Sequence, residues 1–555
     1  MWDPELAELE RRKEQAERMG GADRVARQHA SGRLTVRERL AALTDGWQEV
    51  GALAGHATED GFTPSNVIIG RARIGGRRVV VCGDDFTVRG GAADAAIHEK
   101  QILAERMAGE MRVPLIRLID GTGGGGSVKQ LEEYGRTYVP YNPGWDQVVA
   151  NLGRVPVIAL ALGPVAGLGA ARLVTSHVSI MVKELSQVFI AGPAVVEAGM
   201  GERVGKEELG GWRTAAAAGT VDLVAASEQE AFDLTGQVLG YLPQNAWHPP
   251  PIIGSSSSSG AADSSTSADS SGSADSSGFS GSSGFSGSSR FSGSSRFSGS
   301  SDFADAPGRT APELRDLVPR DRRRPYDMRR ILELVFDTGS VLELGRRFAP
   351  SLITALARLD GHPVAVLASD PRVYGGGMTA QGADKMARFV DLAETFHLPV
   401  VHLVDQPGFV IGTAAEKAGT IRRGARALAA VYQSTVPWAS VLVRRVFGVA
   451  GAAHRPHDRY TLRVAWPSGD WGSLPIEGGL EVAFKRLLAE AGRDAAALKA
   501  EIAERLEAVR SPFRTAEAFL VEDIIDPAET RPVLTDWIRD AYAVLDPGPR
   551  DTTRP

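Results

Sequence analysis

The sequence predicts an α/β protein that contains two copies of one fold, and two observations support this prediction. The segment Val155–Ser176, VPVIALALGPVAGLGAARLVTS, joins a β-branched apolar run to a glycine-punctuated loop and then to an alanine-rich stretch. This pattern is typical of a buried strand that turns directly into a helix. Much of the first half of the chain then recurs in the same order 285 residues later. Matches at one constant offset indicate an internal duplication.

The elements of the first half follow from local patterns. Residues up to about 45 have the spacing of amphipathic helices. Two apolar runs flank the pair Gly75-Gly76, which suits a tight hairpin turn. A helix with one apolar face follows, then a strand that ends at Asp120, and a helix closes the half. In order, the predicted ranges are strands at Val67–Ile74 and Val79–Cys82, a helix at about Glu99–Arg112, a strand at Leu115–Ile119 and a helix near Glu228–Leu242.

The second half repeats these elements. The segments DDFTVRGG and VPLIRLID of the first half correspond to the segments DPRVYGGG and LPVVHLVD of the second half. The paired positions are Gly76 and Gly361, Asp85 and Asp370, Gly90 and Gly375, Lys100 and Lys385, Pro114 and Pro399, and Asp120 and Asp405. The glycine loop also has a counterpart, RVFGVAGA at Arg445–Ala452. We therefore expect two strand-to-helix turns of one kind.

A segment of different composition separates the halves. Ser255–Ser301 consists almost entirely of Ser, Gly, Ala and Asp, with a phenylalanine every six residues from Phe279 to Phe297. Such a segment cannot bury enough apolar surface to offset its ordering entropy, so we expect a flexible linker. The predicted domains are residues 1–250 and 309–555, with residues 251–308 as a disordered linker.

Composition excludes several classes of protein. A net charge of −6 gives no reason to expect nucleic acid or an anionic membrane as a partner. The single cysteine, Cys82, excludes an intrachain disulfide and a multi-cysteine metal site, and no metal is expected. No apolar run is long enough to span a bilayer, and the charged N-terminus is unlike a signal peptide. A cytoplasmic protein is therefore expected.

The two turns are the candidate sites. A strand that enters a helix through a tight turn leaves backbone N–H groups unpaired, and these could hold a phosphate, a carboxylate or an oxyanion. The loops are poor in acids, bases and nucleophiles, and GxSxG, HExxH and GxxxxGK[ST] motifs do not occur there. Backbone amides are therefore the expected catalytic groups. His454 and His457 follow the second turn, and either a structural or a substrate-contacting role is open for them.

The chain resembles the carboxyltransferase (β) subunits of biotin-dependent acyl-CoA carboxylases, the propionyl-, acetyl- and methylcrotonyl-CoA carboxylase group. The similarity covers nearly everything except the linker. The motifs that carry it are QHASGRLTVRERL (Gln28–Leu40), DDFTVRGGA (Asp84–Ala92), GPVAGLGA (Gly163–Ala170), KEELGG (Lys206–Gly211), VDQPGFVIGTAAEKAGTIRRGA (Val404–Ala425), AWP (Ala465–Pro467) and VEDIIDPAETRPVL (Val521–Leu534).

This resemblance implies an enzyme with two tandem crotonase-type (ClpP/crotonase) ββα-superhelix domains. It implies carboxyl transfer from carboxybiotin to the α-carbon of an acyl-CoA. By position, the amides of Gly167 and Leu168 would stabilise the thioester enolate, and those of Val449 and Ala450 the ureido oxygen of biotin. The residues implied to bind substrate are Gly163, Ala166, Gly408, Phe409, Gly448 and Ala452.

The resemblance also implies partners. No biotinyl Met-Lys-Met stretch occurs, so biotin would be carried on another chain, the biotin carboxylase or biotin carboxyl carrier subunit, while a coenzyme A thioester is the substrate. In this family the site lies between the first half of one subunit and the second half of another. A homo-oligomer, commonly a hexamer built from dimers, is therefore expected.

Departures from the family pattern leave alternatives open. At the positions of the family's two glycine pairs, this chain has Gly167-Leu168 and Gly448-Val449. The strand that ends at Asp120 is followed by Gly121-Thr122-Gly123-Gly124-Gly125-Gly126, whose role as a substrate lid is left open. Ala452 replaces a residue that is often larger or acidic, which leaves the acyl group undetermined. The alternatives are a decarboxylase that runs the reverse transfer, a scaffold without activity, and a crotonase-type hydratase or isomerase. The last usually has a glutamate beside its amide pair, and none occurs in Gly163–Ser176.

Overall fold

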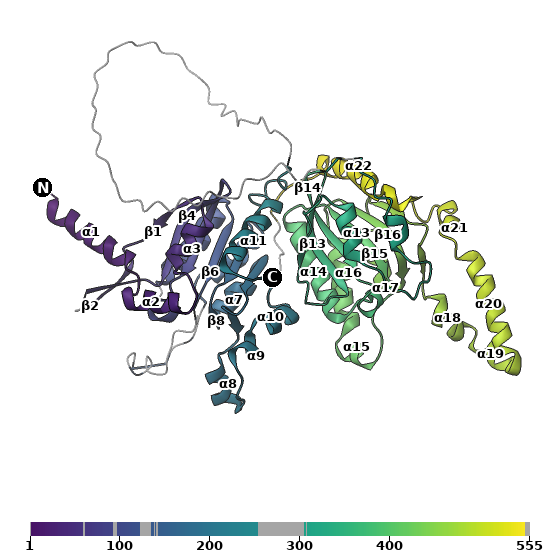
Figure 1. The fold of residues 1–555 in the computed structure, drawn as a ribbon, viewed down its shortest axis with the longest axis horizontal. Coiled ribbons are helices and arrows are strands. Elements are labelled where there is room, and N and C mark those ends of the chain that lie inside the picture. The colour runs from purple at the N-terminus through teal and green to yellow at the C-terminus, as the bar shows by residue number, and fades with distance from the viewer. Residues whose placement is uncertain are drawn as a thin grey trace, which may run out of the picture.

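A computed structural model of the chain describes residues 2–58, 61–92, 97–121, 132, 135–137, 139, 142–253, 305–306 and 308–549. In this described part, the chain forms two α/β units that lie side by side, each built on one large sheet (Figure 1). Residues 254–304 and 307 of the predicted linker 251–308, and all of the candidate lid Gly121–Gly126 except Gly121, lie outside the described residues.

The first unit is organised around a seven-stranded sheet with the order β1-β4-β5-β6-β7-β9-β11. The first two pairings of this order are antiparallel, and every later pairing is parallel. The central strands β6, β7 and β9 are buried along their whole length, as expected for parallel strands that are covered on both faces. The strands are β1 (Gly46–Val50), β4 (Val67–Ile74), β5 (Arg77–Asp84), β6 (Leu115–Ile119), β7 (Val157–Ala161), β9 (Val178–Val182) and β11 (Leu223–Ala225).

Helices and two small sheets surround this sheet. Thr35 and Glu38 form a capping box that starts one of the helices, because each side chain satisfies a backbone N–H of the other residue. The helices are α1 (Asp3–Glu17), α2 (Ala22–Ala30), α3 (Val36–Leu43), α4 (His98–Met111), α6 (Trp145–Asn151), α7 (Leu168–Val174), α8 (Pro193–Met200), α9 (Lys206–Gly210), α10 (Trp212–Ala218) and α11 (Glu228–Tyr241), with a short 3-10 turn η1 (Arg89–Gly91). The small sheets pair β2 (Gly55–Thr58) with β3 (Gly61–Pro64), and β8 (Pro164–Ala166) with β10 (Gln187–Phe189).

The second unit has the sheet order β12-β13-β14-β15-β16-β17-β19, and β18 also pairs with β16. Its strands are β12 (Leu342–Leu344), β13 (Leu352–Leu359), β14 (His362–Ser369), β15 (Val400–Gln406), β16 (Trp438–Phe447), β17 (Leu462–Ala465), β18 (Asp470–Gly472) and β19 (Asp523–Ile524). Its helices are α12 (Leu314–Leu317), α13 (Met328–Val335), α14 (Ala380–Thr395), α15 (Thr413–Lys417), α16 (Thr420–Gln433), α17 (Gly448–Ala452), α18 (Ile476–Ala483), α19 (Lys485–Glu490), α20 (Ala495–Val509), α21 (Pro512–Glu517) and α22 (Thr530–Ala543), with 3-10 turns η4 (Tyr374–Gly376), η5 (Gly492–Asp494) and η6 (Pro527–Glu529).

The two units repeat each other in space, which confirms the predicted duplication. Both sheets begin with two antiparallel pairings and continue with parallel ones. The hairpin turns correspond residue by residue: Gly75 and Gly76 have φ angles of 55° and 77°, and Asp360 and Gly361 have 52° and 76°. The η1 and η4 turns also correspond, with glycines at positive φ in both.

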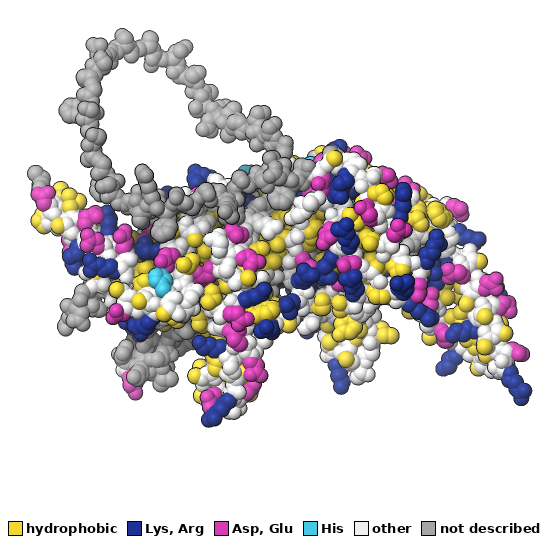
Figure 2. Space-filling model, viewed as in Figure 1, with side chains coloured by type: hydrophobic (Ala, Val, Ile, Leu, Met, Phe, Trp, Pro, Cys, Tyr) yellow, Lys and Arg dark blue, Asp and Glu magenta, His cyan; other side chains and the backbone are white. Residues whose placement is uncertain are grey.

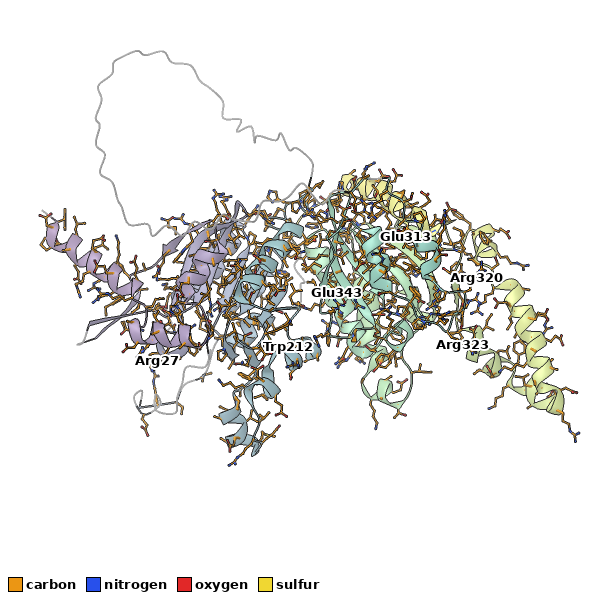
Figure 3. The ribbon with its side chains drawn as sticks, viewed as in Figure 1. Arg27, Trp212, Glu313, Arg320, Arg323 and Glu343 are labelled. Carbon is orange, nitrogen blue, oxygen red and sulfur yellow. The ribbon has the colours of Figure 1, made fainter. Side chains whose placement is uncertain are left out.

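Direct contacts join the units. Arg388 forms an ion pair with Asp222, and the N–H of Gly345 donates to the Asp222 carbonyl at 2.8 Å. The guanidinium of Arg347 lies 4.7 Å from the ring centroid of Trp212, which is labelled in Figure 3. One cluster of buried apolar side chains also contains residues of both units. The two repeats therefore pack against each other through both polar and apolar groups.

Local structure agrees with most of the predicted ranges. The strands Val67–Ile74 and Leu115–Ile119 have the predicted limits. The helix α4 differs from the prediction by one residue at each end, and α11 differs by one residue at its C-terminal end. The predicted glycine loop after β7 differs, because its first residues form β8 and pair with β10. In the described part of the chain, no helix combines the length and the apolar character needed to cross a bilayer.

Candidate active site

The first strand-to-helix turn runs from the end of β7 to the start of α7. Gly167 has φ 56° and ψ −122°, a backbone conformation that residues with a Cβ rarely adopt. Leu168 follows as the first residue of α7, and no side chain caps this end of the helix. Among the described residues, none accepts a hydrogen bond from the Leu168 N–H, and the adjacent Gly167 is exposed. The Leu168 N–H is therefore unpaired within the described part of the chain.

Gly163 has a packing role beneath this turn. A Cβ at this position would lie 1.9 Å from Oδ1 of Asp120 and 2.6 Å from Nη1 of Arg33. Those two side chains form an ion pair at 2.8 Å, and Asp120 is fully buried. Arg39 also pairs with Asp120, at 2.6 Å. Gly163 is thus required because the Asp120 carboxylate and its arginines occupy the space of a side chain.

The second turn, at the end of β16, has the same design. Gly448 has φ 61°, and Val449 and Ala450 follow in the first turn of α17. In the described part of the chain, no group accepts a hydrogen bond from the N–H of Val449 or of Ala450. Ala450 is buried, whereas the Val449 side chain is 57% exposed. The second unit therefore also presents backbone donors at a strand-to-helix turn.

A buried carboxylate lies next to the second turn as well. Asp405, the counterpart of Asp120, accepts hydrogen bonds from Tyr326 at 3.0 Å, from Arg444 at 3.0 and 3.2 Å, and from the Arg445 side chain at 2.6 and 3.0 Å. Burial opposes its ionisation, yet Arg445 and Arg444 hold the pKa of Asp405 below its ordinary value. Asp120 and Asp405 thus occupy equivalent positions but are paired with arginines from different elements.

An arginine anchors the helix of the first turn. Arg117 of β6 donates through Nη1 to the carbonyls of Arg172 and Thr175, at 2.9 and 2.7 Å. Its other nitrogens pair with the buried Glu105 of α4 at 2.9 and 3.0 Å. The end of α7 is therefore fixed to the central sheet through a charged side chain.

A histidine occupies the equivalent strand position in the second unit, 285 residues later. His402 of β15 donates through Nδ1 to the His454 carbonyl at 3.1 Å, just beyond α17. Trp438 and Ser440 of β16 donate to the same oxygen, both at 2.8 Å. A carbonyl only accepts, so Nδ1 of His402 must carry its hydrogen. Burial lowers the pKa of His402 to about 4, and this anchor is therefore neutral near pH 7.

Gly408 and Phe409 lie beside the second turn. Gly408 has φ 118°, and a Cβ there would lie 3.9 Å from the Phe447 carbonyl, directly before Gly448. Its carbonyl accepts from the Met378 N–H at 3.0 Å. The Phe409 ring packs against Gly424 of α16, where a Cβ would lie 2.3 Å from the ring. A Cβ at Gly408 would therefore contact the residue before the turn, while the Phe409 ring packs against α16.

Ala166, Ala452 and the two histidines complete the predicted set. Ala166 ends β8 and pairs with Phe189, directly before the first turn. Ala452 ends α17 and is exposed. His454 is buried, its Nδ1 donates to the Gly451 carbonyl at 2.8 Å, and burial lowers its pKa to about 3. A neutral, enclosed imidazole that caps α17 has a structural role. His457 is exposed and stacks on Tyr432, with ring centroids 5.4 Å apart.

A further acidic side chain, Asp84 at the end of β5, lies beside Asp120. Burial raises the pKa of Asp84 to about 6, and its Oδ2 accepts from the Asp120 N–H at 3.2 Å. Asp84 opens the motif DDFTVRGGA, but nothing in the local sequence distinguishes it from Asp85. The anchors Arg117 and His402 were also missed, because a lone polar residue within a buried strand carries no local signal of its partner.

The geometry defines a class of protein, a duplicated α/β fold in which each repeat presents backbone amides at a strand-to-helix turn. In each repeat, a side chain of the central sheet donates hydrogen bonds to carbonyls at or just beyond the end of the helix that follows this turn. Backbone donors fixed in advance stabilise oxyanions, each by about 3 kcal/mol in known enzymes. Since α7 and α17 belong to different units (Figure 1), one chain carries two such sites.

Comparison with known proteins identifies the family to which the chain belongs. The family model described as the carboxyl transferase domain matches residues 27–270 and 294–541, and the chain belongs to this family. The propionyl-CoA carboxylase beta chain of Saccharopolyspora erythraea is 31% identical over 95% of this chain and 91% of its own length. The methylmalonyl-CoA decarboxylase subunit alpha of Veillonella parvula is 29% identical over 93% and 91%. The crystal structure of transcarboxylase 12S, described as a hexamer assembly with methylmalonyl-coenzyme A bound, has a TM-score of 0.80 at 29% identity and covers 100% of this chain and 97% of its own.

These findings confirm three predictions made from the sequence. The resemblance to the carboxyltransferase subunits, the fold of two tandem crotonase-type units and the assignment as a carboxyltransferase are all correct. The roles of the individual turn residues and the limits of the predicted domains remain predictions.

Proposed function

We propose that this chain is the carboxyltransferase subunit of a biotin-dependent acyl-CoA carboxylase, and that it transfers a carboxyl group from carboxybiotin to the α-carbon of an acyl-CoA. The observation that carries this proposal is the pair of equivalent turns with unpaired backbone donors in a chain of the carboxyl transferase family. The transfer generates two oxyanions, and the chain offers two such turns.

The first turn is assigned to the acyl-CoA. When the α-proton leaves, negative charge develops on the thioester oxygen, and the amides at Gly167 and Leu168 would donate to it. Gly163 would leave room for the Asp120 carboxylate beneath the turn, and Ala166, which pairs with Phe189, would fix the residue directly before it. The fixed anchor at Arg117 limits the movement of α7, so the donors need not be reorganised during the reaction.

The second turn is assigned to biotin. Bound carboxybiotin would supply the carboxyl group that is transferred and, as that group leaves, a ureido nitrogen basic enough to accept the α-proton of the acyl-CoA. The amides of Val449 and Ala450 would donate to the ureido oxygen, and Gly448 and Gly408 permit the close approach of backbone that this requires. The exposure of Val449 fits a ligand that arrives on a separate carrier.

Partners follow from this assignment. Biotin would be carried by a biotin carboxylase or biotin carboxyl carrier subunit. The two turns lie in separate units of the chain, which supports a site formed between the first unit of one copy and the second unit of another. A homo-oligomer is therefore proposed, and transcarboxylase 12S is described as a hexamer.

Removal of a single backbone N–H tests the assignment of the first turn. Proline is tolerated at the first residue of a helix, and the ψ of −122° at Gly167 mirrors the extended geometry preferred before proline. Leu168→Pro should therefore leave the fold intact and reduce transfer of labelled carboxyl from methylmalonyl-CoA to free biotin by about 10²- to 10³-fold.

The control variant Leu168→Ala keeps the N–H and should lose less than about tenfold. Equal losses in both variants would show that the side chain, not the amide, matters. Absence of transfer by the wild-type chain, with the oligomer intact, would favour a scaffold without activity. The Veillonella relative favours one alternative, a decarboxylase that runs the reverse transfer, and comparison of both directions with a copurified biotin subunit would separate the two.

The acyl group is expected to depend on Ala452. This residue is exposed at the end of α17, the helix that would face the acyl-CoA turn of another copy in the proposed site, so a larger acidic side chain there would narrow the space for an acyl tail. Ala452→Asp should restrict the accepted acyl-CoAs in a panel from acetyl to long-chain thioesters, whereas Ala496→Asp on α20 should not. Unchanged selectivity would place Ala452 outside the acyl pocket.

A further inference from the structure

A run of arginines lies near the start of the second unit. The segment Arg320–Arg324, with the sequence RDRRR, lies between α12 and α13. Arg320, Arg323 and Arg324 are exposed, and in the described part of the chain none of them forms an ion pair with a carboxylate. Lys and Arg side chains gather over the second unit on the face shown in Figure 2, and Figure 3 labels Arg320 and Arg323 near α20.

The middle arginine of this run, Arg322, fixes it to the fold. Its guanidinium pairs with Glu507 of α20 at 3.1 Å and with Asp470 of β18 at 3.6 Å. At the end of the run, the carbonyl of Arg324 accepts from Nη1 of Arg444 at 2.9 Å. The run is therefore held in place without the guanidinium groups of its three unpaired arginines.

The three unpaired arginines do not stabilise the fold through their charges. Like charges held close together repel one another. The run contains one carboxylate, that of Asp321, and its Oδ1 accepts from the backbone N–H of Arg323 at 3.0 Å. A surface of this kind is complemented by negative charge on a partner.

The contacts that hold the run place it beside the second turn. The strand β18, which Arg322 contacts, pairs with β16 as far as Phe447. The carbonyl of Ser473, the residue after β18, lies 3.5 Å from a Cβ built at Gly448. Arg444, which holds the other end of the run, precedes the same turn in β16. The unpaired arginines therefore border the turn to which biotin is assigned.

We propose that Arg320, Arg323 and Arg324 form a docking surface for an acidic face of the protein domain that carries biotin. The assignment rests on the proposed function, and it specifies which surface of the second unit receives the carrier and which charge the carrier presents. The chain has a net charge of −6, so its overall field repels an acidic protein, whereas a local basic surface attracts that protein to one place. Complementary charges of this kind orient two proteins as they meet and raise the rate of association.

Carboxyl transfer from the full-length chain to two acceptors tests this proposal. One acceptor is the biotin subunit that copurifies with the chain, and the other is free biotin, which has no protein surface. The triple variant Arg320→Ala/Arg323→Ala/Arg324→Ala should have a KM for the biotin subunit about tenfold higher at low salt, and a KM for free biotin within about twofold of the wild type. The difference between variant and wild type should shrink as the salt concentration rises, because salt screens exposed charges.

A matched control separates the docking surface from net charge. Arg71, Arg73 and Arg78 are exposed on β4 and β5 of the first unit, and among the described residues no carboxylate pairs with them either. Arg71→Ala/Arg73→Ala/Arg78→Ala therefore removes the same charge from a different surface. Its KM for the biotin subunit should stay within about twofold of the wild type.

Equal increases in the KM for the biotin subunit in the two triple variants, or no increase in either, would overturn the proposal. So would an increase for free biotin as large as that for the biotin subunit, because the arginines would then act on the turn and not on the carrier. An increase confined to the KM for the acyl-CoA would assign the arginines to that substrate instead. A wild-type chain that transfers carboxyl to neither acceptor, with its oligomer intact, would refute the proposed function itself.

Discussion

The carboxylate of Asp405 is expected to hold the second turn in place. The side chain is fully buried and accepts hydrogen bonds from Tyr326, from Arg444 and from both the backbone and the side chain of Arg445. Arg445 lies in β16, two residues before Phe447 and the turn itself. The substitution Asp405→Asn keeps the shape of the side chain and removes its charge.

The cost follows from what the substitution leaves behind. Two guanidinium groups, with side chains only 2% and 17% exposed, would lose their charged partner. Removal of one member of a buried ion pair costs about 3–5 kcal/mol, and the amide oxygen of Asn retains part of the hydrogen bonding, so we expect about 3 kcal/mol. Because the pKa of Asp405 is lowered in the folded state, this stabilisation is present above the ordinary pKa of an aspartate and is lost as pH falls through the lowered value.

Urea unfolding at pH 7, followed by circular dichroism, measures the effect. The control is Glu197→Gln, since Glu197 forms an exposed ion pair with Arg203, with side chains 50% and 87% exposed. That pair should contribute less than about 0.5 kcal/mol. If Asp405→Asn lowers the free energy of unfolding no more than the control does, the carboxylate does not support the turn.

Two further predictions concern buried histidines. His402→Leu removes a hydrogen-bond donor to the His454 carbonyl, whereas the side-chain amide of His402→Asn can replace that donor. We expect the leucine variant to have a higher KM for free biotin and nearly the same affinity for acyl-CoA. Equal kinetics in the two variants would contradict the anchoring role. His177 accepts from the Val157 N–H at 3.0 Å and donates to the Leu152 carbonyl at 2.8 Å, which requires a neutral ring, and burial lowers its pKa to about 4. Below pH 6.5 the unfolded chain takes up a proton at His177 that the folded chain does not, so the free energy of unfolding falls as the pH is lowered. Between pH 7 and pH 5.5, the free energy of unfolding of His177→Gln, measured in urea, should fall by about 1 kcal/mol less than that of the wild type. An identical pH dependence in the two proteins would refute the assignment.

Several features could be predicted because they depend on local sequence. The hairpin at Gly75-Gly76 and the strand Leu115–Ile119 follow from turn chemistry and apolar runs. The offset of 285 residues revealed the duplication, and with it the existence of a second turn at Gly448. The strand β8 escaped prediction, because its partner β10 is more than twenty residues away and glycine and proline dominate the local pattern.

The sequence by itself therefore determined the repeated architecture, the family and the positions of the two strand-to-helix turns, since each depends on neighbouring residues or on a constant spacing. Only the tertiary structure decided what holds those amides in place. Asp120 pairs with Arg39, which is 81 residues away in the sequence, and Asp405 accepts from Tyr326, which is 79 residues away. Such pairs form because burial forces charged and polar groups to find partners, whatever their separation along the chain.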